Sequence, residues 1–411
     1  MPRKPSIVTD FSSAAAAAAH SVMYRYVAPV AKVPGTLIGA TQEPDPRSLS
    51  QRMMHWNYWW QAHLMDAMVD AGMRHAREGD SDQATVWFKH AQAMIAGIRA
   101  RNMGKVATSF YDDMAWLALA VERMDSLSVQ LKSSGSRIAQ DAGTALMSQL
   151  RGGVASGLAF AGGGVSWAKQ HRDFVNMPAT APSALAFGQA ADHETAFALW
   201  QWTNEHLWDS ERSLYIDGVH AKSGGLEPER SIHSYNQGTG LAGLLYLDSL
   251  DSSFKDRLDF DPLQRAQELV VSIARSCSTP YERADGTVVR VISSEGRGDR
   301  GLFDAILVRH LAQAALYKPL DEDVRQLCAL LIRDTAQLLW EGRREFDPTL
   351  PMNEPGIDPG EIRNECVSIF SPEAIRPVSE VLKPGAPVEL SAQVGAWMIM
   401  EAAALLESAG R

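Results

Sequence analysis

The sequence predicts an all-α protein, an (α/α)6 toroid with short β segments in its loops. About twelve segments repeat apolar residues at helical spacing, and few show the alternation of a strand. Polar-aromatic clusters recur at the start or middle of alternate helices, whereas the intervening helices, such as 81–101 and 321–342, are amphipathic covers. An inner ring that carries a site and an outer ring that covers it would produce this alternation.

The composition limits the class of protein. The chain has 411 residues, 45% of them hydrophobic and 21% charged, which suits one large core. Its net charge of -10 argues against a nucleic-acid partner, which needs a basic surface. No apolar run approaches the roughly 20 residues of a membrane span. Because the composition does not shift along the chain, we expect a single monomeric domain over 1–411, with 1–9 as a flexible tail.

The N-terminus and the cysteines bear on the compartment. A basic start followed by Ala14 to Ala19 is similar to a secretory signal, but Asp10 interrupts it and alanine is only weakly apolar. An alanine-rich helix capped by Thr9 or Asp10 is the better interpretation. The three cysteines, Cys277, Cys328 and Cys366, have no metal-ligand spacing. Buried free thiols and a cytoplasmic location are therefore expected.

The remaining elements follow in order. Further helices are predicted over 46–77, 81–101, 112–131, 137–150, 178–191, 192–208, 234–250, 262–276, 301–317, 321–342 and 391–408. Leu214 to Gly218 suggests a short strand and turn, and Thr287 to Ile292 a β-hairpin arm. The Pro-rich stretch 346–389 is expected to be loop packed against the body.

A glycine-rich stretch runs from Gly152 to Gly164 and leads to Trp167. It lacks the lysine and the preceding strand of a phosphate-binding loop. We expect a tight loop that lets the backbone and Trp167 approach a ligand.

Two adjacent acids, Asp112 and Asp113, stand at the start of an apolar helix. Trp116 lies on the helical face of both. Two carboxylates beside an aromatic ring cannot both ionise easily, so one pKa should rise while the other stays low. Acid-plus-nucleophile chemistry on a glycosidic bond requires this division. Alternatively, the acids only stabilise the positive end of the helix dipole.

Two other helices carry polar-aromatic clusters. Near the centre of 46–77, Gln61 and His63 stand among tryptophans, either as satisfied core groups or as the lining of a wet pocket. Another cluster, Tyr235, Asn236 and Gln237, opens an apolar helix, where Asn236 is alternatively an N-cap. A toroid would bring these clusters and the acid pair to one cleft.

The motifs together resemble those of glycoside hydrolase family 76, the endo-α-1,6-mannanases. The motifs occur in the family's order, and the similarity spans about residue 10 to 408. They are Trp59-Trp60-Gln61-Ala62-His63, Tyr111-Asp112-Asp113-Met114-Ala115-Trp116, Gly162-Gly163-Gly164-Val165-Ser166-Trp167 and Tyr235-Asn236-Gln237-Gly238.

The resemblance implies an (α/α)6 barrel of retaining enzymes that cleave α-1,6-linked mannan, with no metal or organic cofactor. It implies Asp112 as the nucleophile and Asp113 as the acid/base, with their carboxyl groups about 5–5.5 Å apart. An α-mannan-type glycan is the expected partner; the exact glycan and endo versus exo action stay open. The positions expected to bind substrate are Gln61, His63, Tyr111, Trp116, Trp167, Asn176, Tyr235, Asn236, Gln237, Asp299 and Arg309.

The sequence departs from the family's pattern at one place. The family commonly shows Phe-Lys-Gly-Ile-Phe followed closely by an arginine. Here Phe303 and Arg309 are kept, but Asp304 and Ala305 replace the lysine and glycine. That part of the cleft should differ in charge and shape, which affects the substrate more than the reaction class. Upstream, Asp299 is either a sugar-binding acid or an ordinary loop acid.

Three other functions remain open. A transglycosylase would pass the same covalent intermediate to a sugar hydroxyl. A sugar epimerase on a similar toroid would use histidines, for which His63, His233 and His310 are candidates, but the acid pair would then be idle. A silent glycan-binding module would not need two strained acids.

Overall fold

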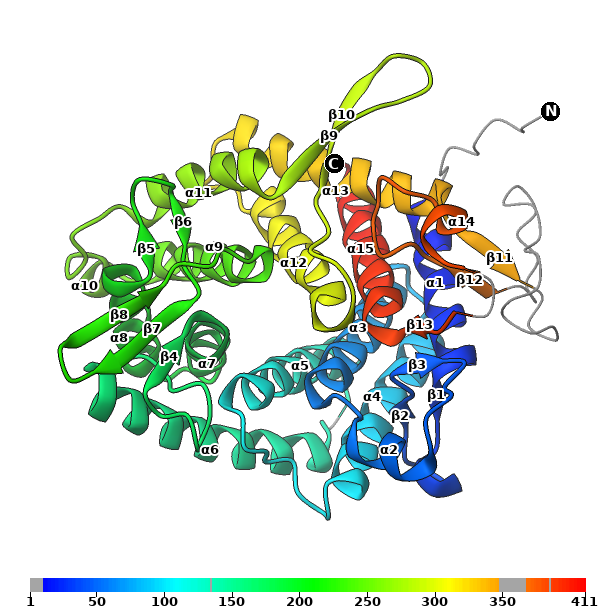
Figure 1. Cartoon of the computed structure of the whole chain (residues 1–411), viewed down its shortest axis with the longest axis horizontal. Helices are drawn as coiled ribbons and strands as arrows, with labels where there is room; N and C mark the ends of the chain where they lie inside the picture. The colour runs from blue at the N-terminus through cyan, green and yellow to red at the C-terminus, as the bar shows by residue number, and fades with distance from the viewer. Residues whose placement is uncertain (1–9, 134, 347–366, 384–385) are drawn as a thin grey trace.

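The computed structural model describes residues 10–133, 135–346, 367–383 and 386–411. These residues form two concentric rings of antiparallel helices, and Figure 1 shows the rings closing where the last long helix, α15, meets the first, α1. The predicted all-α toroid is therefore confirmed.

Six inner helices pack side by side in chain order, and the last contacts the first. They are α3 (Tyr58–Arg77), α5 (Tyr111–Gln130), α7 (Met177–Gln189), α9 (Ser234–Ser249), α12 (Phe303–Leu316) and α15 (Leu390–Ser408). Six outer helices cover them: α4 (Ser81–Arg101), α6 (Arg137–Ala161), α8 (His193–His206), α11 (Pro262–Ser276), α13 (Glu322–Glu341) and α1 (Phe11–Tyr26). One cluster of buried apolar side chains joins the two rings.

Local sequence signals explain several helix starts. The Asp10 side chain accepts a hydrogen bond from the Ser12 N–H at 2.9 Å, which confirms it as the cap of α1. Asn176 caps α7, and Pro178 occupies the first turn, where its missing N–H has no consequence. The start of α5 is instead fixed by the chain across from it, because the Tyr111 N–H donates to the Trp167 carbonyl at 2.9 Å.

Short helices, 3-10 turns and short strands connect the helices of the two rings. The minor helices are α2 (Leu49–Met54), α10 (Ser252–Lys255) and α14 (Val378–Val381), with 3-10 turns η1 (Val30–Lys32) and η2 (Gly298–Leu302). The strands are β1 (Val27–Ala28), β2 (Ile38–Gly39), β3 (Gln42–Glu43), β4 (Phe174–Asn176), β5 (Trp208–Asp209), β6 (Leu214–Tyr215), β7 (Gly218–Lys222), β8 (Gly225–Glu229), β9 (Ser278–Glu282), β10 (Val288–Ile292), β11 (Arg344–Phe346), β12 (Val367–Ile369) and β13 (Val388–Glu389). Antiparallel pairing places β7 between β4 and β8, with Asn176 opposite Gly218.

Two predicted boundaries are wrong. The segment 46–77 is two helices, because the backbone breaks between α2 and α3 and Asn57 adopts a left-handed conformation. The helix expected to stop at Leu150 continues to Ala161, so much of the glycine-rich stretch is helical. Close packing explains a glycine within this helix, because a Cβ at Gly157 would clash with the backbone of Gly164.

Other expectations fall partly within the described residues. The β-hairpin arm is present as β9 and β10. Cys277 and Cys328 are buried free thiols, whereas Cys366 lies outside the described residues. Half of the expected loop at 346–389 also lies outside them, and β12, α14 and β13 are short regular elements in the described half. Among the described helices, none has the length and apolar character needed to cross a membrane.

Candidate active site

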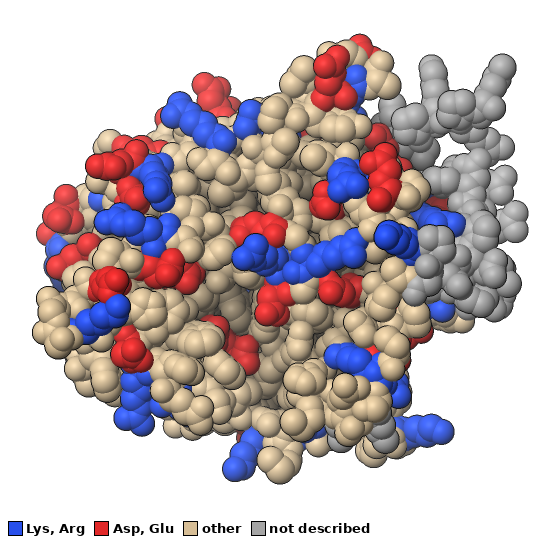
Figure 2. Space-filling model, viewed as in Figure 1, with Lys and Arg blue, Asp and Glu red and all other residues tan. Residues whose placement is uncertain are grey.

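A pocket of about 250 Å³ lies where the inner helices α3, α5, α7, α9 and α12 begin. Converging helix N-termini give this end of the toroid a positive potential, which suits carboxylates. Figure 2 shows acidic side chains gathered around a central hollow in the face viewed. The pocket is lined by Trp59, Asp112, Trp116, Trp167, Phe174, Asn176, Pro178, Asp217, Tyr235, Asp299 and Phe303.

The carboxylate of Asp112 is held by two hydrogen bonds. Its Oδ2 accepts from the Trp167 indole Nε1–H at 2.9 Å, and its Oδ1 accepts from the Asp113 backbone N–H at 2.8 Å. Burial raises the pKa of Asp112 to about 6, while these two bonds favour the ionised form and limit the rise. Asp112 can therefore be an anion at neutral pH.

The carboxyl of Asp113 has a different environment. No hydrogen bond to it is found among the residues that the structure describes. Burial and the charges of Asp112 and Asp299 raise the pKa of Asp113 well above its usual value. Asp113 is not part of the pocket lining itself, but both acids whose charges act on it are. Both pKa values are thus raised, so the expectation that one of them stays low is wrong. The two acids still differ, because the hydrogen bonds to Asp112 limit its rise and make it the more acidic of the pair.

Aromatic rings form much of the remaining wall. The rings of Tyr235 and Phe303 lie 4.0 Å apart between centroids, and Trp116 is 6.4 Å from Tyr235. Asp299 accepts hydrogen bonds from the indoles of Trp59 at 3.0 Å and Trp60 at 2.9 Å. Flat apolar rings beside carboxylates can bind a ligand that has both C–H faces and hydroxyl groups.

The end of the glycine-rich stretch forms the turn that leads from α6 to Trp167. Gly162 and Gly164 have positive φ angles of 71° and 69°, which turn the chain sharply after α6. A Cβ at Gly163 or Gly164 would collide with the ring of Trp202. The expected tight loop is therefore short, and it presents Trp167 to Asp112.

Several expected residues lie at the pocket, and several do not. Asp112, Trp116, Trp167, Asn176, Tyr235 and Asp299 line it. Asn236 lies just behind, since its Nδ2–H donates to Asp217 at 2.9 Å. Asn236 is not an N-cap, because α9 already begins at Ser234.

Three of the expected residues lie outside the lining and contact other segments of the chain. Gln61 and Gln237 are fully buried and clamp main-chain groups: Gln61 bonds both polar groups of Gly39, and Gln237 bonds both of Tyr215. The ring of Tyr111 packs against Gly153, away from the lining. These side chains shape the pocket through the segments that they hold.

His63 and Arg309 lie deeper in the toroid and line a separate cavity together with His310. His233 lies behind the catalytic pocket, with its ring 5.8 Å from that of Tyr235 and 5.5 Å from that of Phe303. Its Nδ1 bonds to Glu295 at 2.7 Å, which raises the pKa of this histidine. The three candidate histidines of an epimerase therefore do not form one site around the acid pair.

Sequence reasoning missed Asp217, Phe174, Pro178 and Phe303 as lining residues, and it left Trp59 unassigned. Asp217 is the most consequential, since it is largely buried and burial raises its pKa. It follows β6 on a short turn, and only the pairing of β4 with β7 brings that turn to the pocket. Its place two residues after a strand does not by itself indicate a site.

A helical toroid with an acid pair beside an aromatic pocket is consistent with a glycoside hydrolase. The family model for glycosyl hydrolase family 76 matches residues 10–347, and the chain belongs to this family. No curated protein matches the chain.

Solved structures share the fold at low sequence identity. One is an inactive α-1,6-mannanase variant from Salegentibacter sp. HEL1_6, with two consecutive aspartates replaced by asparagine, solved with α-1,6-mannotriose. It is 22% identical to this chain, with a TM-score of 0.71, and the match covers 97% of this chain and 100% of that one. A family 76 glycoside hydrolase from a bovine Bacteroides thetaiotaomicron strain is 16% identical, with a TM-score of 0.72, over 97% and 78%. Dfg5 from Chaetomium thermophilum, solved with glucosamine, is 16% identical, with a TM-score of 0.64, over 98% and 93%.

Proposed function

We propose that this glycoside hydrolase cleaves α-1,6-mannosidic linkages of a mannan-type glycan with retention, through a covalent mannosyl-aspartate intermediate. The observation that carries the proposal is the unequal environment of the adjacent acids: Asp112 accepts two hydrogen bonds and Asp113 accepts none among the described residues. The inactive mannanase variant, altered at two consecutive aspartates and solved with α-1,6-mannotriose, supports both the pair and the substrate.

In the first step, the Asp112 carboxylate attacks the anomeric carbon and the glycosidic C–O bond breaks. Asp113 gives its proton to the departing oxygen. In the second step, Asp113 removes a proton from water, the water oxygen bonds to the anomeric carbon, and Asp112 leaves as a carboxylate. The Trp167 indole N–H stabilises the Asp112 anion at the start and end of the cycle.

The pocket walls support a sugar as the substrate. Tyr235, Phe303 and Trp116 offer apolar ring faces to the C–H face of a pyranose. Asp217 and Asp299 offer carboxylate oxygens to its hydroxyl groups. Asp217 already has one protein partner and Asp299 has two, and these bonds fix the orientation of each acid.

The test is incubation of the purified protein with α-1,6-mannotriose and with linear α-1,6-mannan, followed by product sizing and by NMR of the first anomer released. We expect mannose or short oligosaccharides, with the α anomer formed first. Asp112→Asn and Asp113→Asn should each lower kcat/KM by about 10³-fold or more. Asp125→Asn, on the same helix but away from the pocket, is the matched control and should keep normal activity.

A fluorinated mannosyl fluoride should trap the intermediate, and peptide mass spectrometry should find the sugar on Asp112. Intact mannotriose after prolonged incubation with the wild-type protein would refute the substrate. Release of the β anomer first would refute retention and leave the substrate assignment standing.

A further inference from the structure

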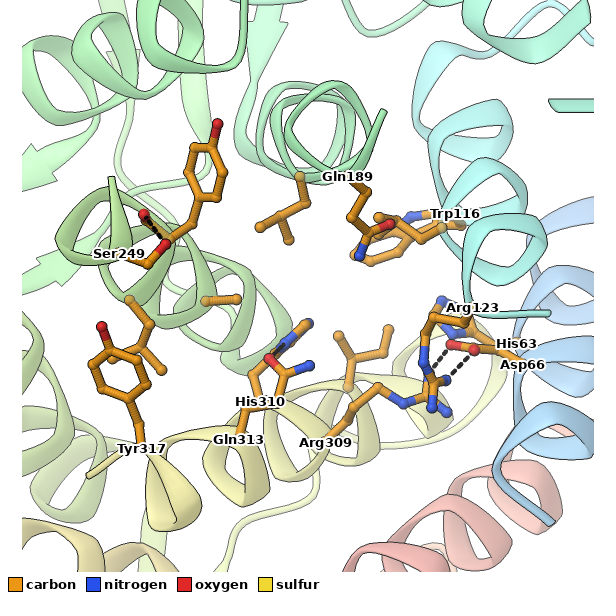
Figure 3. A pocket seen from close by; sticks show the side chains of 16 residues that line it. His63, Asp66, Trp116, Arg123, Gln189, Ser249, Arg309, His310, Gln313 and Tyr317 are labelled. Carbon is orange, nitrogen blue, oxygen red and sulfur yellow. Dashed lines mark hydrogen bonds and ion pairs between the residues drawn. The ribbon is translucent and has the colours of Figure 1, made fainter. Parts of the chain in front are cut away.

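A second cavity, of about 300 Å³, lies on the toroid axis beyond the catalytic pocket (Figure 3). It is lined by later turns of the same inner helices: Leu119 and Arg123 lie roughly 10 and 16 Å further along α5 than Asp112, at 1.5 Å per residue. Gln189, Ser249 and Gln313 are exposed at its rim. Trp116 lines both cavities and forms part of the wall between them.

The charged groups of this axial cavity compensate one another. Arg123 and Arg309 each bond both Asp66 and Asp70, so two guanidinium groups and two carboxylates form a closed quartet. Figure 3 shows Arg123, Arg309 and Asp66 together on one side of the cavity. Burial lowers the pKa of His310 to about 4, so this ring is neutral. An ionic ligand would find no uncompensated charge here, which favours a neutral one.

Apolar side chains form much of the remaining wall. Its aliphatic part is lined by Leu119, Leu185, Ala242, Leu245 and Ile306, beside the rings of Trp116, Tyr246 and Tyr317. A sugar or other polyol would leave several hydroxyl groups unpaired against these side chains, at a cost for each. The body of a fitting ligand is therefore apolar.

The end of the axial cavity opposite the rim has a polar side chain without a hydrogen-bond partner among the described residues. His63 is only 3% exposed, yet neither of its ring nitrogens has a hydrogen-bond partner among the described residues. Its ring lies against Trp59 and Trp116, with centroids 5.5 and 5.0 Å away, and faces the cavity. Burial lowers its pKa well below the usual value, so it is a neutral imidazole with one donor and one acceptor. A hydroxyl group can bond to it in either tautomer.

We propose that the axial cavity is a second ligand site, which binds a neutral, mainly aliphatic molecule of on the order of ten non-hydrogen atoms with its hydroxyl end at His63. The aliphatic part lies along Leu119, Leu185 and Leu245. The site is separate from the acid pair, and its occupation does not depend on the proposed hydrolysis.

Isothermal titration of the full-length protein with 1-hexanol tests this site. We expect saturable binding of one molecule per chain with a Kd on the order of 1 mM. Hexanoate, which has the same chain length and a negative charge, should bind at least about tenfold more weakly. Saturating α-1,6-mannotriose, added to the Asp112→Asn variant so that the sugar is not cleaved, should leave hexanol binding unchanged, because the sugar is expected in the other pocket.

Two variants locate the binding. Leu185→Trp fills the cavity from a half-buried wall position and should weaken hexanol binding at least about tenfold, whereas Leu330→Trp, at an exposed position on α13, should leave it unchanged. His63→Phe keeps the ring but removes its nitrogens, and should weaken 1-hexanol by about fivefold or more while leaving 1-chlorohexane unaffected.

A crystal of the wild-type protein soaked in 6-bromohexan-1-ol gives an independent measurement that needs no variant. The bromine should appear in the axial cavity, towards the rim. Absence of saturable binding up to the solubility limit of hexanol, unchanged binding by Leu185→Trp, or bromine only outside the cavity would each overturn the proposal.

Discussion

Replacing Trp167 by phenylalanine should move the acidic limb of the pH profile upward. The indole Nε1–H donates to Asp112 Oδ2 at 2.9 Å and favours the ionised carboxylate. The ring of Trp167 also packs against Phe110 and Phe174, and phenylalanine keeps most of this apolar contact. The substitution therefore removes the hydrogen bond more than the packing.

The size of the shift follows from the type of bond. A hydrogen bond to a charged group contributes about 1.5–3 kcal/mol, and one pKa unit corresponds to about 1.4 kcal/mol. Loss of the bond should raise the pKa of Asp112 by about 1 to 2 units from its value of about 6. Because the nucleophile must be ionised, kcat/KM below that value should fall by about 10- to 100-fold relative to wild type.

The assay is the initial rate on α-1,6-mannotriose from about pH 4.5 to about pH 9, analysed as kcat/KM. Trp397→Phe is the matched control, since that indole also donates to a buried carboxylate, Glu401, at 3.0 Å, but on α15. It should leave the acidic limb in place. An acidic limb that stays within about 0.3 unit in Trp167→Phe would refute the assignment of Asp112 as the group that must be ionised.

Two further predictions concern stability. Burial raises the pKa of Asp304 from 3.8 to about 7 in the folded state, so the wild-type protein loses stability as the pH rises through this window. Asp304→Asn removes that loss. Allowing for partial exposure, the substitution should stabilise the protein by about 1–2 kcal/mol more at about pH 8 than at about pH 5. An equal gain in Tm at both pH values would contradict this. Arg309→Ala leaves Asp66 and Asp70 with one guanidinium, and should lower the free energy of urea unfolding by about 3–5 kcal/mol. Arg309→Lys should lower it less. A loss below about 1 kcal/mol for Arg309→Ala would show that the quartet does not stabilise the fold.

The features that the sequence predicted well are local ones. The placement of the acid pair and of Trp116 on one helical face follows from periodicity within a few residues, and the structure places Asp112 and Trp116 in one pocket. The alternation of site-bearing and covering helices predicted the two rings for a similar reason. The apolar pattern of each helix indicates how many of its faces are buried.

The errors come from interactions between distant segments. Glycines at 152–164 favour a loop by their intrinsic propensity, yet Gly153 and Gly157 are helical. They are glycines because Tyr111 and Gly164 approach them too closely for a side chain. Gln61 and Gln237 have the composition of a wet site, but each satisfies a backbone segment that lies 22 residues away in the chain. Propensity and composition alone do not reveal which distant backbone needs a partner.

Arg309 shows why the same limit applies to a functional assignment. It is 243 residues from Asp66, and the two meet only because α12 and α3 are both inner helices of a closed ring. There it joins the quartet that separates the axial cavity from the side of the ring near Glu401. An arginine that compensates two buried carboxylates is as constrained as one that binds a sugar, because its loss leaves a buried charge unpaired. Its retention in the family motif is therefore explained by the integrity of the ring, without a contact to the substrate.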